Sequence, residues 1–199
     1  MCNPYITSRV IKYPSFVNQS TIHCQGSSGF RFKLEIDFVG KYTKDKLVVI
    51  MKNPSSASAY TCDNTISKVC NTAYYNGYSG VIIMNLFPIR ATYARQIQSF
   101  YAHNNYNSIM SANLSLIQKI STGRDVVFAW GTDTIGGKRN YPNYYDNAIR
   151  NITSTIVNNT YYANRCKCKN SSCTTPSHSQ IRYPLHGLAW CNHSTLIAY

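Results

Sequence analysis

Three apolar runs of strand length constrain the fold of this chain more than any other feature. They are residues 47–51 (LVVIM), 81–86 (VIIMNL) and 126–130 (VVFAW). Runs of this length that do not alternate with polar residues are typical of parallel strands covered on both faces. We therefore expect the three runs to form the centre of one sheet.

A helix is expected between the first two runs. Within residues 63–77 the apolar side chains recur at helical spacing. Asp63 or Asn64 can serve as the N-cap, and Gly77 stands where the helix would end. The first two strands are therefore predicted to be joined by a helical crossover.

Looser helical patterns cover residues 107–120 and 146–157. Strands that alternate with helices are typical of a doubly wound sheet with right-handed crossovers. The fold class predicted is therefore α/β, with a mainly parallel central sheet and helices on both faces. A hydrophobic content of 44% is enough for one core, and no repeat or linker divides the chain, so residues 1–199 are predicted to form a single domain.

Two segments depart from this alternation of strand and helix. Residues 30–38 (FRFKLEIDF) place five apolar side chains on one face and Arg31, Lys33, Glu35 and Asp37 on the other. This pattern predicts a half-buried antiparallel strand near an edge of the sheet. Residues 158–180 are rich in Asn, Lys, Ser, Thr and Cys without any period, and they are predicted to form a long loop.

Polar turns follow the three core runs. They read KNPSS at 52–56, NLFPIR at 85–90 and WGTD at 130–133. Because ligands of open α/β sheets bind beyond the carboxyl ends of the strands, we expect these turns to converge on one polar pocket. We interpret this pocket as the functional site.

Amide side chains dominate the predicted pocket. Asn53 and Asn85 each offer a donor and an acceptor, which suits the edge of a planar heterocycle, and Arg90 can form a forked contact with phosphate or carboxylate. The backbone amides of Ser55 and Ser56 precede a helix and can receive an anion. Ordinary turn chemistry is the alternative for each residue taken singly. The candidate substrate-binding residues are Pro54, Ser55, Ser56, Asp63, Asn85, Phe87, Arg90, Trp130, Gly131, Arg182 and Pro184.

Several enzyme classes are disfavoured by the residues that the chain contains. Of its seven carboxylates, Asp63 and Asp133 alone fall near the predicted pocket, so a two-carboxylate glycoside hydrolase is not expected. The chain contains no G-x-S-x-G elbow, no G-x-x-x-x-G-K loop and no H-E-x-x-H pair. Amide-centred chemistry or binding is what these exclusions leave.

The net charge of +13 favours a polyanionic partner. A nucleic acid or a nucleotide is the partner that we expect, and a basic surface that only keeps the chain soluble is the alternative. No apolar stretch is long enough to cross a bilayer, and the first ten residues lack the apolar run of a secretory signal. No membrane partner is therefore expected, and a cytoplasmic location is predicted.

Eight cysteines are expected to stay reduced in that location. Cys166, Cys168, Cys173 and Cys191 cluster late in the chain and could hold a structural zinc ion. Their C-x-C-x4-C spacing is not a common zinc-binding spacing, so free thiols are the alternative. The rest of the chain implies no required cofactor.

The motifs MKNPSS, NLFPIRAT, AWG and IRYPLHGL together resemble a family of domains of unknown function, DUF1643, over about residues 30–190. Their order is similar, more distantly, to that of the uracil-DNA glycosylase superfamily. This second resemblance implies that Asn53 holds an attacking water, that Asn85 binds the base edge, and that Pro184 and its neighbours close the site. Tyr183 stands where the superfamily has a histidine, and His186 follows three residues later.

Two functional hypotheses follow from these observations. The first is an enzyme that hydrolyses an N-glycosidic bond in a nucleic acid or nucleotide, with Asn53, Tyr183 and His186 as catalytic residues and Asn85 with a neighbouring aromatic such as Phe87 holding the base. The second is a binding module without catalysis, in which Arg90 and Arg182 grip phosphate. The replaced histidine and the shortage of acids and bases support the second hypothesis, whereas the basic charge fits the first.

Overall fold

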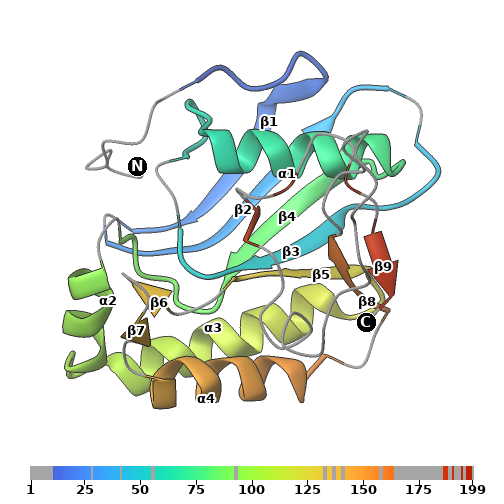
Figure 1. Ribbon diagram of the computed structural model, residues 1–199. Coiled ribbons are helices and arrows are strands. Elements are labelled where there is room, and N and C mark those ends of the chain that lie inside the picture. The colour runs from blue at the N-terminus through green and yellow to red at the C-terminus, as the bar shows by residue number, and fades with distance from the viewer. Residues whose placement is uncertain are drawn as a thin grey trace.

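The computed structural model describes residues 11–27, 29–40, 42–54, 57–91, 94–131, 134–135, 138–139, 142–156, 159–163, 186–187, 190, 194 and 196–198. These residues form a seven-stranded sheet in the order β1-β2-β4-β3-β5-β8-β9 and a separate two-stranded sheet, β6-β7 (Figure 1). The strands are β1 (Val17–Gly26), β2 (Arg31–Phe38), β3 (Leu47–Met51), β4 (Gly80–Asn85), β5 (Val126–Ala129), β6 (Thr134–Ile135), β7 (Lys138–Arg139), β8 (Thr160–Ala163) and β9 (Leu196–Ala198). The helices are α1 (Asn64–Tyr75), α2 (Ala94–Tyr101), α3 (Tyr106–Ser121) and α4 (Pro142–Thr153).

The three apolar runs form adjacent parallel strands, as predicted. β3 pairs in parallel with β4 on one side and with β5 on the other, and β5 pairs in parallel with β8. β1, β2 and β9 are antiparallel to their neighbours. The α/β class is confirmed, but the large sheet is mixed, because its antiparallel outer strands flank a parallel centre.

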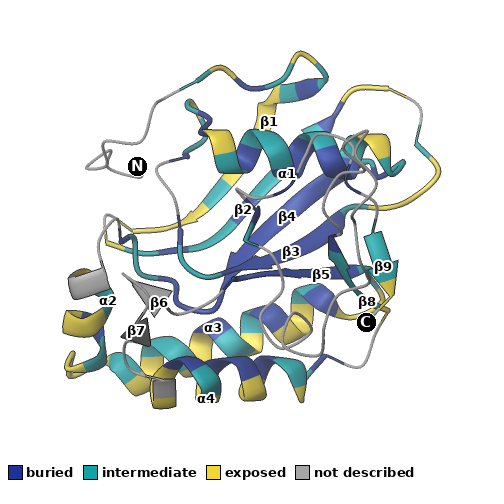
Figure 2. Cartoon of the chain, in the orientation of Figure 1, coloured by how far each residue is buried: buried dark blue, intermediate teal, exposed yellow. Residues whose placement is uncertain are grey.

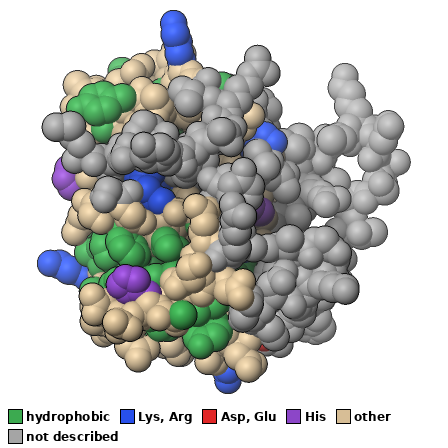
Figure 3. All heavy atoms as spheres, turned by 90° about the vertical axis from the view of Figure 1, so that its left-hand side faces the viewer, with side chains coloured by type: hydrophobic (Ala, Val, Ile, Leu, Met, Phe, Trp, Pro, Cys, Tyr) green, Lys and Arg blue, Asp and Glu red, His purple; other side chains and the backbone are tan. Residues whose placement is uncertain are grey.

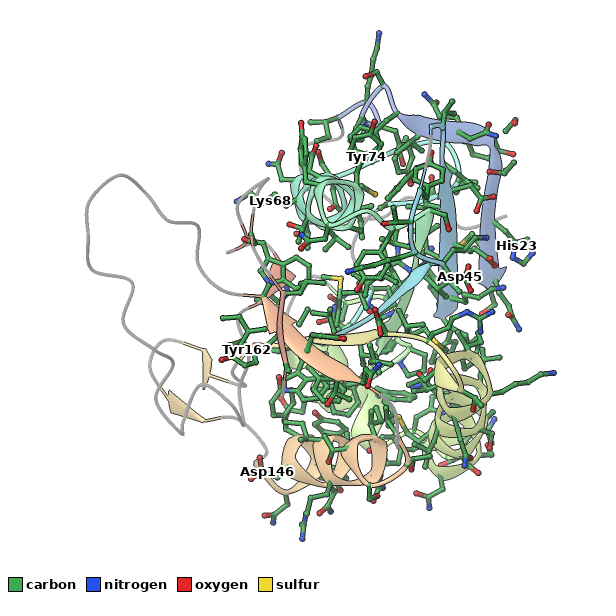
Figure 4. All side chains as sticks on the ribbon, turned by 90° about the vertical axis from the view of Figure 1, so that its right-hand side faces the viewer. His23, Asp45, Lys68, Tyr74, Asp146 and Tyr162 are labelled. Carbon is green, nitrogen blue, oxygen red and sulfur yellow. The ribbon has the colours of Figure 1, made fainter. Side chains whose placement is uncertain are left out.

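Helices cover both faces of the large sheet. α1 lies on one face, and α3 and α4 lie on the other (Figure 1). Figure 4 shows the same layers from the side, with Lys68 and Tyr74 on α1 and Asp146 on α4 at opposite sides of the sheet. The crossover from β3 to β4 therefore lies on one face, whereas the crossovers from β4 to β5 and from β5 to β8 lie on the other.

Alternation along the central strands divides the core into two halves. Leu47, Val49 and Met51 pack in the cluster that contains the apolar face of α1, whereas Val48 and Ile50 pack in the cluster that contains residues of α3 and α4. Every residue of β3, β4 and β5 is buried, and the exposed positions lie on the outer strands, on the outward faces of the helices and in loops (Figure 2). Burial on both faces explains why these runs carry no polar alternation.

α1 begins at the predicted N-cap. The Asp63 carboxylate accepts hydrogen bonds from the backbone N–H of Ile66 at 2.9 Å and from that of Ala57 at 3.2 Å. Asn76 is the C-cap, directly before Gly77. α3 matches the predicted segment closely, while α4 begins earlier than predicted, at Pro142, because proline is well tolerated in the first turn of a helix.

Arg31 departs from the predicted alternation of residues 30–38. β2 is an antiparallel strand next to the edge strand β1, as expected, but the side chain of Arg31 is fully buried. The cause is a β-bulge, because Gln25 pairs with Lys33 while Gly26 pairs with Arg31 and skips Phe32. Because of the bulge, the side chains at the start of β2 point to the opposite side of the sheet from the one that simple alternation predicts. The prediction that Arg31 lies on the polar face is therefore wrong.

The predicted loop over residues 158–180 is wrong at its beginning. Residues Thr160–Ala163 form β8, which extends the parallel centre of the sheet beside β5. The pattern TYYA is too short to reveal a strand, and pairing with β5 supplies the order that periodicity does not predict. Residues 164–180 lie outside the described residues.

Basic side chains are spread over the face of the molecule shown in Figure 3, where the coloured Lys and Arg groups stand apart from one another. The described basic side chains on this face are therefore dispersed. None of the helices in the described part of the chain has the length and hydropathy needed to cross a membrane.

Replacing the cap residue of α1 tests its contribution to stability. Asp63→Ala removes the acceptor of two backbone N–H groups, so we expect the free energy of unfolding to fall by about 1–2 kcal/mol in urea denaturation. Asp45→Ala is the matched control, because that carboxylate is 71% exposed and its ion pair with Arg124 spans 3.6 Å. Its effect should stay below about 0.5 kcal/mol; an equal loss in both variants would contradict the capping role.

Candidate functional site

The carboxyl ends of β3 and β4 stay side by side beyond the last paired residues. The backbone N–H of Leu86 donates to the carbonyl of Met51 at 2.7 Å, and that of Phe87 donates to the carbonyl of Lys52 at 2.9 Å. Met51 is in register with Asn85 on β4 and with Ala129 on β5. The first two polar turns therefore start next to each other, at the edge where adjacent crossovers leave on opposite faces.

Asn85 presents an unsatisfied amide at this edge. It shares the side-chain direction of Val81 and Ile83, which belong to the cluster on the α1 face. Its side chain is 0% exposed, and within the described chain neither Nδ2 nor Oδ1 has a hydrogen-bond partner. Its backbone carbonyl accepts from Nδ2 of Asn113 at 2.9 Å. Each buried polar atom without a partner costs about 1–3 kcal/mol, so this amide needs an explanation beyond folding.

Asn53 ties the turn after β3 to the segment after β4. Its Nδ2 donates to the carbonyl of Ala91 at 2.6 Å and to that of Pro54 at 3.3 Å. Because both hydrogen bonds use the amide nitrogen, Oδ1 is left as the acceptor. The side chain is partly exposed, so water has access to this residue, whereas Asn85 lies deeper.

The turn after β5 meets a distant part of the chain. Gly131 has φ +70°, and a Cβ added to it would lie 3.1 Å from Cβ of His186. A Cβ on Gly187 would in turn lie 3.1 Å from a methyl carbon of Val69 on α1 and 3.4 Å from Cε of Met51. These contacts place His186 and Gly187 between the turn after β5, the end of β3 and α1.

Burial and nearby charges shift the pKa of His186. Burial is the largest cause that lowers its pKa, and the cation of Lys52 lowers the pKa further, while the Asp63 carboxylate raises it. The imidazole is therefore neutral at pH 7 and can donate one hydrogen bond. The Lys52 ammonium lies 5.4 Å from the centre of the Tyr145 ring, which is a cation–π contact.

Phe87 and Trp130 pack in the core. Both side chains are 0% exposed and belong to the cluster on the face of α3 and α4, opposite to the face of Asn85. Phe87 contacts the rings of Tyr101 and Tyr145, and Trp130 lies 4.5 Å from Phe128 between ring centres. Their residue types suit a base-stacking role, but their rings are used in packing.

The remaining candidates divide into two groups. Pro54 is buried and follows Asn53, and Arg90 is partly exposed at the end of the segment after β4. The other predicted positions lie outside the described residues: Ser55, Ser56, Asp133, Arg182, Tyr183, Pro184 and the four cysteines Cys166, Cys168, Cys173 and Cys191. Within the described part of the chain, no group of His, Cys, Asp and Glu is arranged to hold a metal ion.

Sequence reasoning does not predict the surroundings of two charged residues, Lys52 and Arg31. Lys52 stands in the polar turn after β3, but its effect on His186 depends on a contact far along the chain. Arg31 was assigned to the wrong face. The available signal was Gly26, because a Cβ there would lie 2.2 Å from the carbonyl oxygen of Phe30, and a glycine inside a strand pattern often marks a bulge.

A separate groove of about 430 Å³ lies between α3 and α4. Its lining is uncharged and rich in amides, and it consists of Tyr106, Asn107, Met110, Ser111, Asn113, Leu114, Tyr144, Asn147, Ala148, Asn151 and Ile152. Tyr144 stacks on Tyr101 at 4.2 Å, so these tyrosines pack against each other. Because the titratable groups gather at the strand ends on the other face, we place the functional site there.

The lowered pKa of His186 has a measurable effect on stability. The unfolded chain takes up the proton first as the pH falls below about 6.5, so stability should decrease from that pH down to the pKa of the folded state. His186→Asn should make the pH dependence flatter in urea denaturation, whereas His23→Asn, at an exposed position of β1, should not. Identical slopes for wild type and His186→Asn would show that burial does not shift this group.

Comparison with known proteins gives a family for the chain. Neither the curated proteins nor the solved structures contain a match. A family model described as "Protein of unknown function (DUF1643)" matches residues 31–184. The match includes β2 through β8, both asparagines of the strand-end site and the turn that carries Gly131. Since it covers more than half of the sequence, the chain belongs to the DUF1643 family.

Proposed function

We propose that the strand-end site binds a nucleobase and hydrolyses its N-glycosidic bond, in a manner that resembles the uracil-DNA glycosylase superfamily. The observation that carries this proposal is the buried amide of Asn85, whose donor and acceptor are both unsatisfied in the described chain. A side-chain amide presents these two groups side by side, which complements the C=O and N–H edge of a lactam base such as uracil or hypoxanthine.

Asn53 supports a hydrolytic role. Its nitrogen is held by the carbonyls of Ala91 and Pro54, which orients Oδ1 as an acceptor for a water molecule. In the proposed reaction this water attacks C1′ of the sugar. The C1′–N bond breaks, its electron pair leaves with the base, and the proton released from the water neutralises the base anion.

His186 supports the departure of the base. A neutral imidazole can donate one hydrogen bond to a base oxygen as negative charge develops on it, without transferring a proton. The Lys52 cation, which acts on the same imidazole, favours negative charge in this part of the site. The proposed roles are thus base recognition for Asn85, water positioning for Asn53 and charge stabilisation for His186.

The two asparagines should separate binding from chemistry. Single-turnover release of uracil and hypoxanthine from oligonucleotides is the measurement, and base binding is followed by titration with the free nucleoside. Asn85→Ala should weaken base binding by roughly 5- to 150-fold, because it removes a bidentate contact worth about 1–3 kcal/mol. Asn53→Ala should lower the rate of release about 10²-fold and leave binding unchanged.

Asn71→Ala provides the matched control, because within the described chain the side chain of this asparagine on α1 donates to the carbonyl of Ser67 at 2.8 Å. It should behave as wild type in both assays. Absence of base release from every oligonucleotide would remove the enzymatic part of the proposal. Equal base binding by wild type and Asn85→Ala would remove base recognition as well.

A further inference from the structure

Arg31 is a buried cation whose hydrogen bonds are incomplete. Its side chain is 0% exposed, and Nη1 donates to the carbonyl of Ala57 at 2.8 Å. Nε and Nη2 have no hydrogen-bond partner in the described chain. Burying a charge costs several kcal/mol unless it is paired and hydrogen-bonded, so this guanidinium is a costly feature to retain.

A second arginine points to the same face of the sheet. Phe30 forms an antiparallel bridge with Ile89. Two backbone hydrogen bonds lie on either side of this bridge. The N–H of Arg31 donates to the carbonyl of Pro88 at 2.8 Å, and the N–H of Arg90 donates to the carbonyl of Gly29 at 2.9 Å. Phe30 and Ile89 pack in the cluster on the face of α2, α3 and α4. Neighbouring residues in extended chain point to opposite faces, so Arg31 and Arg90 both face the side of α1.

The effect of the Arg90 charge on the pKa of Arg31 agrees with this placement. Burial and the Arg90 cation lower the pKa of Arg31 to about 10, which leaves it charged at neutral pH. Asp63 is the described carboxylate that acts on Arg31, and it also caps α1 through Ile66. The charge of this carboxylate is therefore shared between Arg31 and the N-terminus of α1.

We infer that Arg31 and Arg90 form a subsite for the phosphate group of a nucleotide whose base lies on Asn85. Asn85 faces the same side of the sheet, and Arg90 ends the segment that begins at Asn85. Guanidinium groups bind phosphate oxygens through forked, charge-assisted hydrogen bonds, which the unused N–H groups of Arg31 can supply. Arg90 is partly exposed and Arg31 is fully buried, so the phosphate meets Arg90 first. The identity of the ligand rests on the proposed function, whereas the anion subsite stands on the arginines alone.

Titration with inorganic phosphate, against chloride at equal ionic strength, tests the subsite. Phosphate should raise the melting temperature of the wild-type chain. Arg31→Met and Arg90→Gln should each weaken phosphate binding by roughly 10- to 100-fold, the loss expected for a charge-assisted hydrogen bond. Arg124→Met is the control, because Arg124 also donates Nη1 to a backbone carbonyl, that of Ile120 at 2.8 Å, and it should bind phosphate as wild type does. If Arg31→Met does not fold, Arg90→Gln decides the test at a partly exposed position.

No response of the wild type to phosphate, or equal binding by Arg90→Gln, would overturn the subsite. 2′-Deoxyuridine 5′-monophosphate, 2′-deoxyuridine and a deoxyuridine oligonucleotide then separate the two proposals. The monophosphate should bind more tightly than the nucleoside in wild type, and this gain should vanish in Arg90→Gln. A gain with the oligonucleotide alone would assign the phosphate to a polymer. Asn85→Ala should keep its affinity for inorganic phosphate even if base recognition fails.

Discussion

The position of β3 at the centre of the parallel strands determines the rest of the architecture. Its five residues are buried on both faces, and it pairs with β4 and β5 at once. The crossover from β3 passes over the face of α1, while the crossovers from β4 and β5 pass over the other face (Figure 1). Turns that leave adjacent strands in opposite directions cannot fill the space above the strand ends, and this space is where the polar side chains gather.

Polar groups at the edge of an apolar core work against stability. Asn85 and Arg31 lie on the face of α1, where the core cluster consists of aliphatic, aromatic and cysteine side chains such as Val49, Tyr78 and Cys70. Apolar residues at these positions would avoid the cost of unsatisfied hydrogen bonds. Local conflicts of this kind are typical of functional sites, since a ligand can supply the contacts that the fold does not.

Polar side chains at the strand ends and on the neighbouring α1 face lie at different depths. Lys52, Asn53, Arg90 and His186 are partly exposed, while Asn85 and Arg31 are fully buried. A ligand that reaches the deeper groups loses its water, and hydrogen bonds and charges become stronger in such surroundings. This arrangement favours recognition by a small number of polar contacts rather than by a wide charged surface, which agrees with the dispersed basic groups seen in Figure 3.

The apolar runs, the cap at Asp63 and the polar turns at Asn53 and Asn85 could all be predicted from the sequence, because each depends on neighbours within a few residues. Tertiary structure decided which polar side chains are buried. The bulge opposite Gly26 turns Arg31 toward Arg90, pairing with β5 orders β8, and packing on Tyr101 and Tyr145 directs Phe87 away from Asn85. Periodicity shows which residues of one strand or helix share a face. The partner of each face depends on register between segments far apart in the chain, and that register exists only in the folded protein.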